Sequence, residues 1–192
     1  YPTAFFVGFS LFIILGDVIV KEDVEIKKFS HVFLLNFPMY LNFFILFFIV
    51  LCSVFVLSNA GENIFSNNIL NYFYVDLVYA SQTINTLDAI CLTVLMGLFI
   101  GIMGTVPGHE LVHRKKKKFD MLIGNWLLAF SWDCAFAVEH VYGHHKNVGL
   151  SIDPATAKRG ENIYAFIIRA MINEHRDAWR IVIKQCKKKN KS

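Results

Sequence analysis

Five of the seven histidines in this chain lie in two short clusters whose spacing suits a metal ion. The first histidine box is His109-Glu-Leu-Val-His113, and the second is His140-Val-Tyr-Gly-His144-His145. Imidazole is the commonest metal ligand among protein side chains. Histidines four residues apart share a helix face, so His109 with His113, and His140 with His144, can each offer two nitrogens to one ion. The two boxes together predict a shared metal site.

The first box by itself also matches the His-Glu-x-x-His pattern of zinc proteases, in which Glu110 is the general base. Such a protease needs one further ligand, whereas three more histidines follow here. Five imidazoles exceed the needs of one tetrahedral zinc and favour two ions, and iron accepts imidazole while leaving positions for O2. Glu110 and Glu139 adjoin histidines and are candidates for orienting the imidazoles or for binding metal themselves. The alternative is that both are surface carboxylates.

The composition is that of a membrane protein. Hydrophobic residues make up 55% of the 192 residues and charged residues only 18%, against roughly 25% in soluble domains. We therefore expect the lipid bilayer, and not nucleic acid, to surround or contact this chain. The four cysteines have no Cys-x-x-Cys spacing, which argues against a disulfide framework and against a thiolate metal site.

Three apolar runs are each close to the ~20 residues that a helix needs to cross a bilayer. Gly97 and Gly101 in the third run have the spacing that allows close helix packing. Pro107-Gly108 is expected to end that run, directly before the first box. We predict an all-α, polytopic membrane helical bundle forming a single membrane domain over residues 1–192, with spans at residues 4–20, 32–57 and 89–106.

Lysine and arginine predict the orientation of these spans. They are present in residues 21–30 and throughout residues 107–192, but residues 58–88 contain neither. The positive-inside rule therefore puts the histidine boxes and the basic region, residues 107–192, in the cytoplasm. Residues 121–138 are also mostly apolar, yet a crossing there would separate the two boxes. We expect this segment to be re-entrant or buried.

The ends of the sequence suggest a fragment. The chain starts at Tyr1 inside an apolar run and ends in a lysine-rich stretch without a terminal element. We expect it to be truncated at both ends, with some of the metal ligands outside it.

Three stretches resemble a known family in their order and spacing. They are His109-Glu-Leu-Val-His-Arg114, Glu139-His-Val-Tyr-Gly-His-His145 and Asp153-Pro-Ala-Thr-Ala-Lys-Arg-Gly-Glu-Asn-Ile-Tyr164. They resemble the integral-membrane alkane hydroxylases (alkane 1-monooxygenases), which belong with xylene monooxygenase and the fatty-acid desaturases among membrane non-haem di-iron proteins. The resemblance covers nearly all of the chain.

The resemblance implies two iron ions that activate O2 and insert oxygen into a terminal C–H bond of an alkane or alkyl side chain. It implies electrons from rubredoxin or a similar carrier, and a place in the bacterial inner membrane. It also implies that His109, His113, His140, His144 and His145 are iron ligands. No catalytic residue beyond these ligands is expected, and further family histidines lie beyond this chain.

Small departures leave the substrate open. Arg114 stands where many alkane hydroxylases have lysine, and Val106-Pro107-Gly108 replaces the usual approach to the first box. Val112 and Arg114 favour the xylene-type enzymes. The alternatives are a xylene monooxygenase- or desaturase-type relative, a membrane zinc protease, and a metal-binding remnant without activity.

Overall fold

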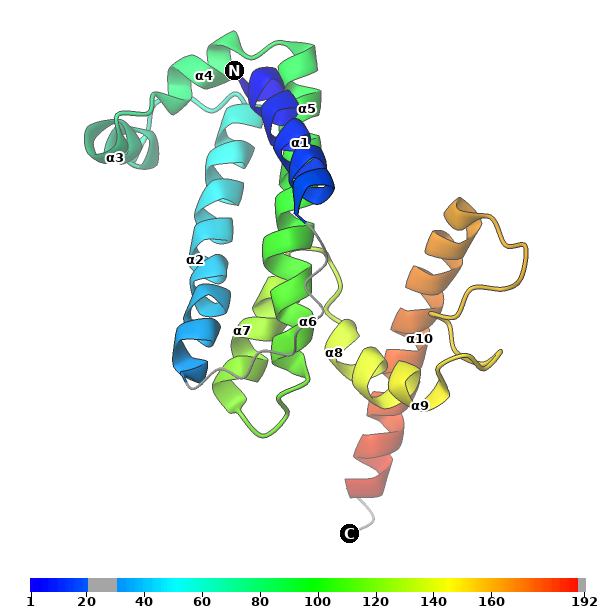
Figure 1. Cartoon of the computed structure of the whole chain (residues 1–192). Coiled ribbons are helices and arrows are strands. Elements are labelled where there is room, and N and C mark those ends of the chain that lie inside the picture. The colour runs from blue at the N-terminus through cyan, green and yellow to red at the C-terminus, as the bar shows by residue number, and fades with distance from the viewer. Residues whose placement is uncertain (21–30, 190–192) are drawn as a thin grey trace. The chain divides into compact units, whose positions relative to one another are not determined.

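The computed structural model describes residues 1–20 and 31–189, and these residues form helices with no strand among them (Figure 1). The expected all-α membrane bundle is confirmed by three long apolar helical stretches. Residues 21–30, whose lysines help to predict the orientation of the spans, lie outside the described residues. The chain separates into two compact units, residues 1–104 and 105–192. The helices of the first unit are α1 (Pro2–Ile19), α2 (Val32–Leu57), α3 (Ile64–Phe73), α4 (Leu77–Thr83) and α5 (Thr86–Phe99).

Three stretches are long and apolar enough to cross a bilayer: Pro2–Ile19, Phe33–Leu57 and Thr86–Val112. Such helices satisfy every backbone polar group internally, which the hydrocarbon core requires. Pro38 lies inside α2 without ending it. The third stretch begins at a capped turn, because the Asn85 side chain accepts a hydrogen bond from the backbone N–H of Asp88.

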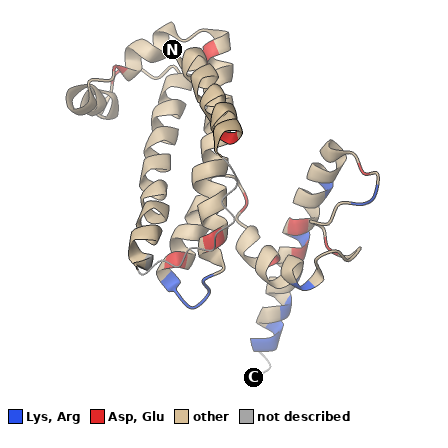
Figure 2. Cartoon of the chain, viewed as in Figure 1, with Lys and Arg blue, Asp and Glu red and all other residues tan. Residues whose placement is uncertain are grey.

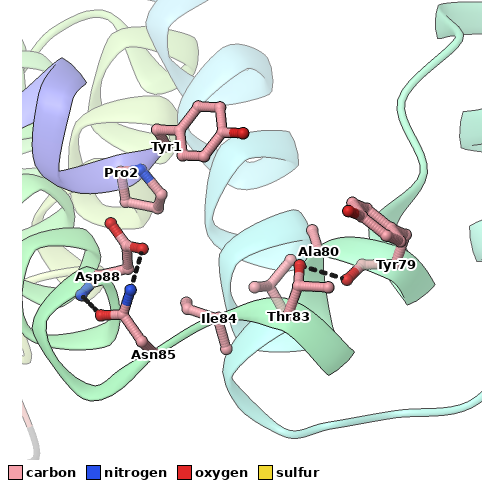
Figure 3. A pocket seen from close by; sticks show the side chains of 9 residues that line it. Tyr1, Pro2, Tyr79, Ala80, Thr83, Ile84, Asn85 and Asp88 are labelled. Atoms are coloured by element: carbon pink, nitrogen blue, oxygen red, sulfur yellow. Dashed lines mark hydrogen bonds between the residues drawn. The ribbon is translucent and has the colours of Figure 1, made fainter.

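In the first unit, α1 is attached to α5 by one polar contact and a set of aromatic rings. Thr3 donates to the Asp88 carboxylate from its backbone nitrogen, at 2.9 Å, and from its hydroxyl, at 2.6 Å. Asn85 donates to the other oxygen of Asp88 (Figure 3). The rings of Phe9 and Phe99 meet edge to face with their centroids 5.2 Å apart. A pocket of about 380 Å³ lies beside Asp88, and its lining residues include no histidine.

The third apolar stretch does not end at Pro107, contrary to expectation. A π-helical segment, η1 (Ile100–Thr105), leads directly into α6 (Val106–Val112), and Pro107 occupies the first turn of α6. A first-turn position tolerates proline, because its backbone nitrogen has no helical acceptor there. The helix therefore continues through the proline and carries the first histidine box at its end.

Close packing occurs at other glycines than the expected pair. A Cβ added to Gly97 or Gly101 would meet nothing within 4 Å among the described residues. A Cβ on Gly124 would instead lie 2.9 Å from the Cβ of Leu111 and 3.1 Å from the carbonyl oxygen of Gly108. Gly124 lies on α7 (Lys118–Ala129), and α6 and α7 therefore cross at the level of their glycines.

The second unit contains the short helix α7 and, near its end, a long helix that packs on the second histidine box. α7 has 12 residues and is about 18 Å long, which is shorter than a bilayer core of about 30 Å. Buried Val112, at the end of α6, and buried Leu128, near the end of α7, pack in one cluster with Ala137. The remaining helices are α8 (Phe136–Glu139), η2 (His140–His144), α9 (His145–Asn147) and α10 (Ile163–Lys189); α10 packs against α8 and η2.

We predict that Gly124→Ala destabilises the second unit. The new methyl group has no room against Leu111 and the Gly108 carbonyl, so the expected cost is about 1–3 kcal/mol. Thermal unfolding of the purified protein in detergent measures this. Gly97→Ala is the matched control, because its methyl group enters open space and alanine favours a helix. Equal melting temperatures for the two variants would contradict the close crossing.

Candidate metal centre

The first histidine box sits at the end of α6. His109 lies in its last turn and His113 caps it. The Nε2 atoms of His109 and His113 are 3.1 Å apart, as the four-residue spacing predicted. Leu111 and Val112 lie between these histidines in the sequence, and both are buried where α6 packs on α7. The packing of α6 therefore sets the direction of both imidazole rings.

The backbone of the second box does not form a regular α-helix. His140–His144 form the π-helical segment η2, whose backbone hydrogen bonds join residues five apart. In an α-helix a residue five positions on points about 140° away. The wider π turn brings His145 back beside His140, with the two Nε2 atoms 3.0 Å apart. Within this box the nitrogen neighbour of His140 is therefore His145, while the ring of His144 stacks on that of His140 with centroids 5.2 Å apart.

Imidazoles from both boxes converge on one point. The Nε2 of His140 lies 2.9 Å from that of His109, while His109 also contacts His113 and His140 also contacts His145. His109, His113 and His140 present nitrogens that all lie within 4.8 Å of one another. The structure thus brings four of the five sequence-predicted histidines together.

Hydrogen bonds alone do not satisfy this cluster. Each Nε2 offers either one N–H or one lone pair, yet those of His109 and His140 each have two close nitrogen neighbours. A cation instead accepts a lone pair from every ring. Nitrogens bound to one ion at about 2.1 Å and at right angles are about 3.0 Å apart, which matches the observed spacing. The donor set fits a transition-metal ion.

The electrostatics also favour metal over protons. Burial, followed by the neighbouring imidazoles of His109 and His145, lowers the pKa of His140 to about 4. Burial and the same two neighbours lower the pKa of His113 as well. Both rings are therefore neutral near pH 7, and a neutral imidazole is the form that binds metal.

The fifth histidine is oriented by a carboxylate. His144 Nδ1 lies 2.9 Å from Oδ2 of Asp153, which is fully buried. Burial alone would raise the pKa of Asp153, but hydrogen bonds from Thr156, from the backbone of Ala155 and from His144 outweigh it and hold the pKa below its ordinary value. The ionised carboxylate accepts, so Nδ1 carries the proton and the lone pair of His144 is on Nε2. This is the arrangement that prepares a histidine for metal.

A surface loop keeps Asp153 in place. Arg169 of α10 donates to both oxygens of Glu161, at 2.6 and 2.8 Å. The same guanidinium donates to the carbonyl oxygens of Pro154 and Thr156, which follow Asp153 in its loop. Arg169 therefore fixes the loop on α10, and the loop fixes His144.

The two candidate glutamates differ from each other. Glu110 pairs with Arg114 at 3.0 Å, and its side chain is 55% exposed. Glu139 is buried under η2, where its Oε1 finds no hydrogen-bond partner among the described residues. Burial, then the charges of Glu174 and Asp153, raises the pKa of Glu139 to about 7. Gly143 leaves the room for this carboxyl, since a Cβ there would collide with it.

Sequence reasoning missed Asp153 as a site residue, although it opens one of the stretches that carried the family resemblance. Its partner His144 is nine residues away and the loop between them is irregular, so no periodic pattern links the two. His175 lies outside both boxes in the sequence, and its Nδ1 donates to the Met171 carbonyl oxygen.

We predict that Arg169→Ala speeds amide hydrogen exchange in residues 153–161, because the loop loses its anchor. The Arg169 hydrogen bond, followed by that of the Lys158 backbone, lowers the pKa of Glu161 from 4.5 to about 2. The anchor's contribution is therefore full above pH 4.5 and is lost as the pH falls towards 2. Exchange measured by mass spectrometry tests this, with Arg180→Ala as the control. Unchanged exchange at neutral pH would contradict the anchoring role.

Comparison with known proteins agrees with this geometry. The sequence model of the family described as fatty acid desaturase matches residues 86–191, more than half of the chain. No solved structure matches it.

Curated relatives are monooxygenases. Alkane 1-monooxygenase of Pseudomonas putida is 34% identical over 58% of this chain and 30% of its own length. Alkane 1-monooxygenase 1 of Alcanivorax borkumensis is 33% identical, with the same two coverages of 58% and 30%. The xylene/toluene monooxygenase hydroxylase component of Pseudomonas putida is 33% identical over 46% of this chain and 24% of its own length. The chain thus spans less than a third of the length of these relatives. It is a membrane protein that belongs to the fatty acid desaturase family.

Proposed function

We propose that this chain is part of a membrane non-haem di-iron monooxygenase. The whole protein hydroxylates a terminal C–H bond of an alkane or alkyl side chain, using O2 and electrons from rubredoxin or a similar carrier. The observation that carries the proposal is the cluster of imidazole nitrogens from both boxes, 2.9–3.1 Å apart. Relatives named alkane 1-monooxygenase and xylene/toluene monooxygenase support the choice of reaction.

The residues of this chain hold the metal and keep it reactive. His109, His113 and His140, whose nitrogens lie within 4.8 Å of one another, would bind one ion. His145 beside His140, and His144 with its proton set on Nδ1 by Asp153, would add ligands to the centre. Iron supplies the activation of O2 and the oxidation of the C–H bond, which no amino-acid side chain performs. The depressed pKa of His140 keeps that ring neutral without metal, so iron does not compete with a proton there.

The membrane supplies the substrate. His109 lies close to the end of the third candidate span, Thr86–Val112. An alkane dissolves in the acyl-chain region of a bilayer, and apolar contact contributes about 25 cal/mol per Å² buried. A metal centre at the end of a span therefore meets a substrate that arrives through the lipid.

The electron donor reaches the centre from the cytoplasm. The basic loop from Lys115 to Lys118 follows the first box directly, and the positive-inside rule assigns such a loop to the cytoplasmic side of the inner membrane. A soluble rubredoxin-type carrier has access to that side.

The zinc-protease alternative is disfavoured by Glu110. A protease base must reach the metal-bound water, but this carboxylate is half exposed and paired with Arg114. The desaturase-type alternative uses the same metal centre and differs in its product, so product analysis separates it from the hydroxylase.

We predict that His140→Ala lowers iron affinity by at least about tenfold, because this ring contacts imidazoles from both boxes. Metal analysis by mass spectrometry after purification of the protein that carries this sequence measures the loss. His175→Ala is the matched control, since its ring lies on the exposed part of α10. Equal iron content in the two variants would exclude a shared site.

We predict that the protein supplied with O2 and reduced rubredoxin converts octane into 1-octanol. Glu110→Gln retains this activity within about fivefold, because an exposed ion pair contributes about 0–1 kcal/mol. Gas chromatography of the products measures both. An alkene product would favour the desaturase, and protease activity that Glu110→Gln abolishes would favour the zinc enzyme.

A further inference from the structure

Helix α10 has one covered side and one bare side. Ala170 and Ala178 are buried where α10 packs against α8 and η2. A Cβ on Gly143 of η2 would lie 3.3 Å from Ile181, which marks the same side. The helix has 27 residues and is about 40 Å long, so its other side presents a long surface.

The bare side is mostly apolar, with His175 as its one strongly polar member. At 100° per residue, its members fall within an arc of about 100° that contains no Asp, Glu, Lys or Arg. Ile168 is 62% exposed, Trp179 69% and Ile183 49%. The apolar arc consists of Tyr164, Ala165, Ile168, Ile172, Trp179, Val182, Ile183 and Cys186, and it encloses one polar residue, His175. Neither α8 nor η2 covers it, because both pack on the buried alanines of the other side.

The second half of the helix is strongly basic. Figure 2 shows the basic residues of α10 gathered towards its C-terminal end. Residues 176–189 contain six cations against the single carboxylate of Asp177, and that carboxylate is paired with Arg180 at 2.7 Å. Arg176, Arg180 and Lys187 border the apolar arc on one flank, where long side chains can extend past an apolar surface towards phosphates.

We propose that α10 lies along the membrane surface, with the apolar arc in the boundary between headgroups and acyl chains and its cations against anionic lipid phosphates. An uncharged stripe with Tyr and Trp beside a row of Lys and Arg is the chemistry that an anionic bilayer surface accepts. The three candidate spans bring this chain to a bilayer in any case. Because the covered side of α10 packs on η2, the lipid surface supports the helix that holds the second histidine box.

Photocrosslinking identifies the occupant of the apolar arc. The photoreactive residue benzoylphenylalanine is placed at Trp179 or at Ile168 in the protein that carries this sequence. The protein is reconstituted in vesicles of phosphatidylethanolamine and phosphatidylglycerol and irradiated, and adducts are identified by mass spectrometry. We expect about fivefold or more lipid adduct at these positions than at Lys184, which lies outside the arc on the side of α10 that faces η2. Circular dichroism and iron content confirm that each variant is folded.

A second experiment removes positive charge from α10 and measures the lipid adduct again. Replacing Lys187, Lys188 and Lys189 with glutamine lowers the lipid adduct at Trp179 in vesicles with phosphatidylglycerol, but not in vesicles of phosphatidylcholine alone. Adducts of Trp179 with the protein's own chain, or with a second copy of it, would show that protein covers the arc and would overturn the proposal. Equal lipid adduct at Trp179 and Lys184, or no adduct at either, would also overturn it.

Discussion

Four imidazole rings form a row of nitrogen contacts that hydrogen bonds alone cannot satisfy. The helices and loops of the second unit must hold these rings close together. His140 Nε2 has close nitrogen neighbours on both sides, from His109 and from His145. A nitrogen with one proton or one lone pair can serve only one of them. Burial, and after it the repulsion between neighbouring imidazoles, disfavours protonation and lowers the pKa of His140. A shared cation would resolve the conflict, because it accepts a lone pair from each ring.

Helix packing, a π turn and an anchored loop hold the imidazole rings in place. α6 and α7 cross so closely at Gly108 and Gly124 that there is no space for a methyl group. This close packing fixes the position of the first box relative to α7. The π turn of η2 rotates His145 towards His140. From the other side, Arg169 fixes the loop whose Asp153 sets the proton of His144. Each box thus has its own support, and both supports lie within one compact unit.

The sequence predicted an all-α membrane bundle with three apolar helices, because long apolar runs are strong local signals. The run at 32–57 matches α2, whereas the third run extends past Pro107 to Val112, because a proline in the first turn of α6 ends no helix. The spacing of His109 and His113 predicted their contact. The contact of His145 with His140 depends on a π turn, which no histidine spacing reveals, and that of Asp153 with His144 depends on the path of an irregular loop.

X-ray absorption at the iron edge of the iron-loaded protein tests the central claim most directly, because imidazole rings leave a characteristic multiple-scattering pattern. Convergence of His109, His113, His140 and His145 predicts a first shell dominated by nitrogen at about 2.1 Å, with several imidazoles for each iron. A shell made of oxygen or sulfur, with one imidazole or none for each iron, would contradict the shared site.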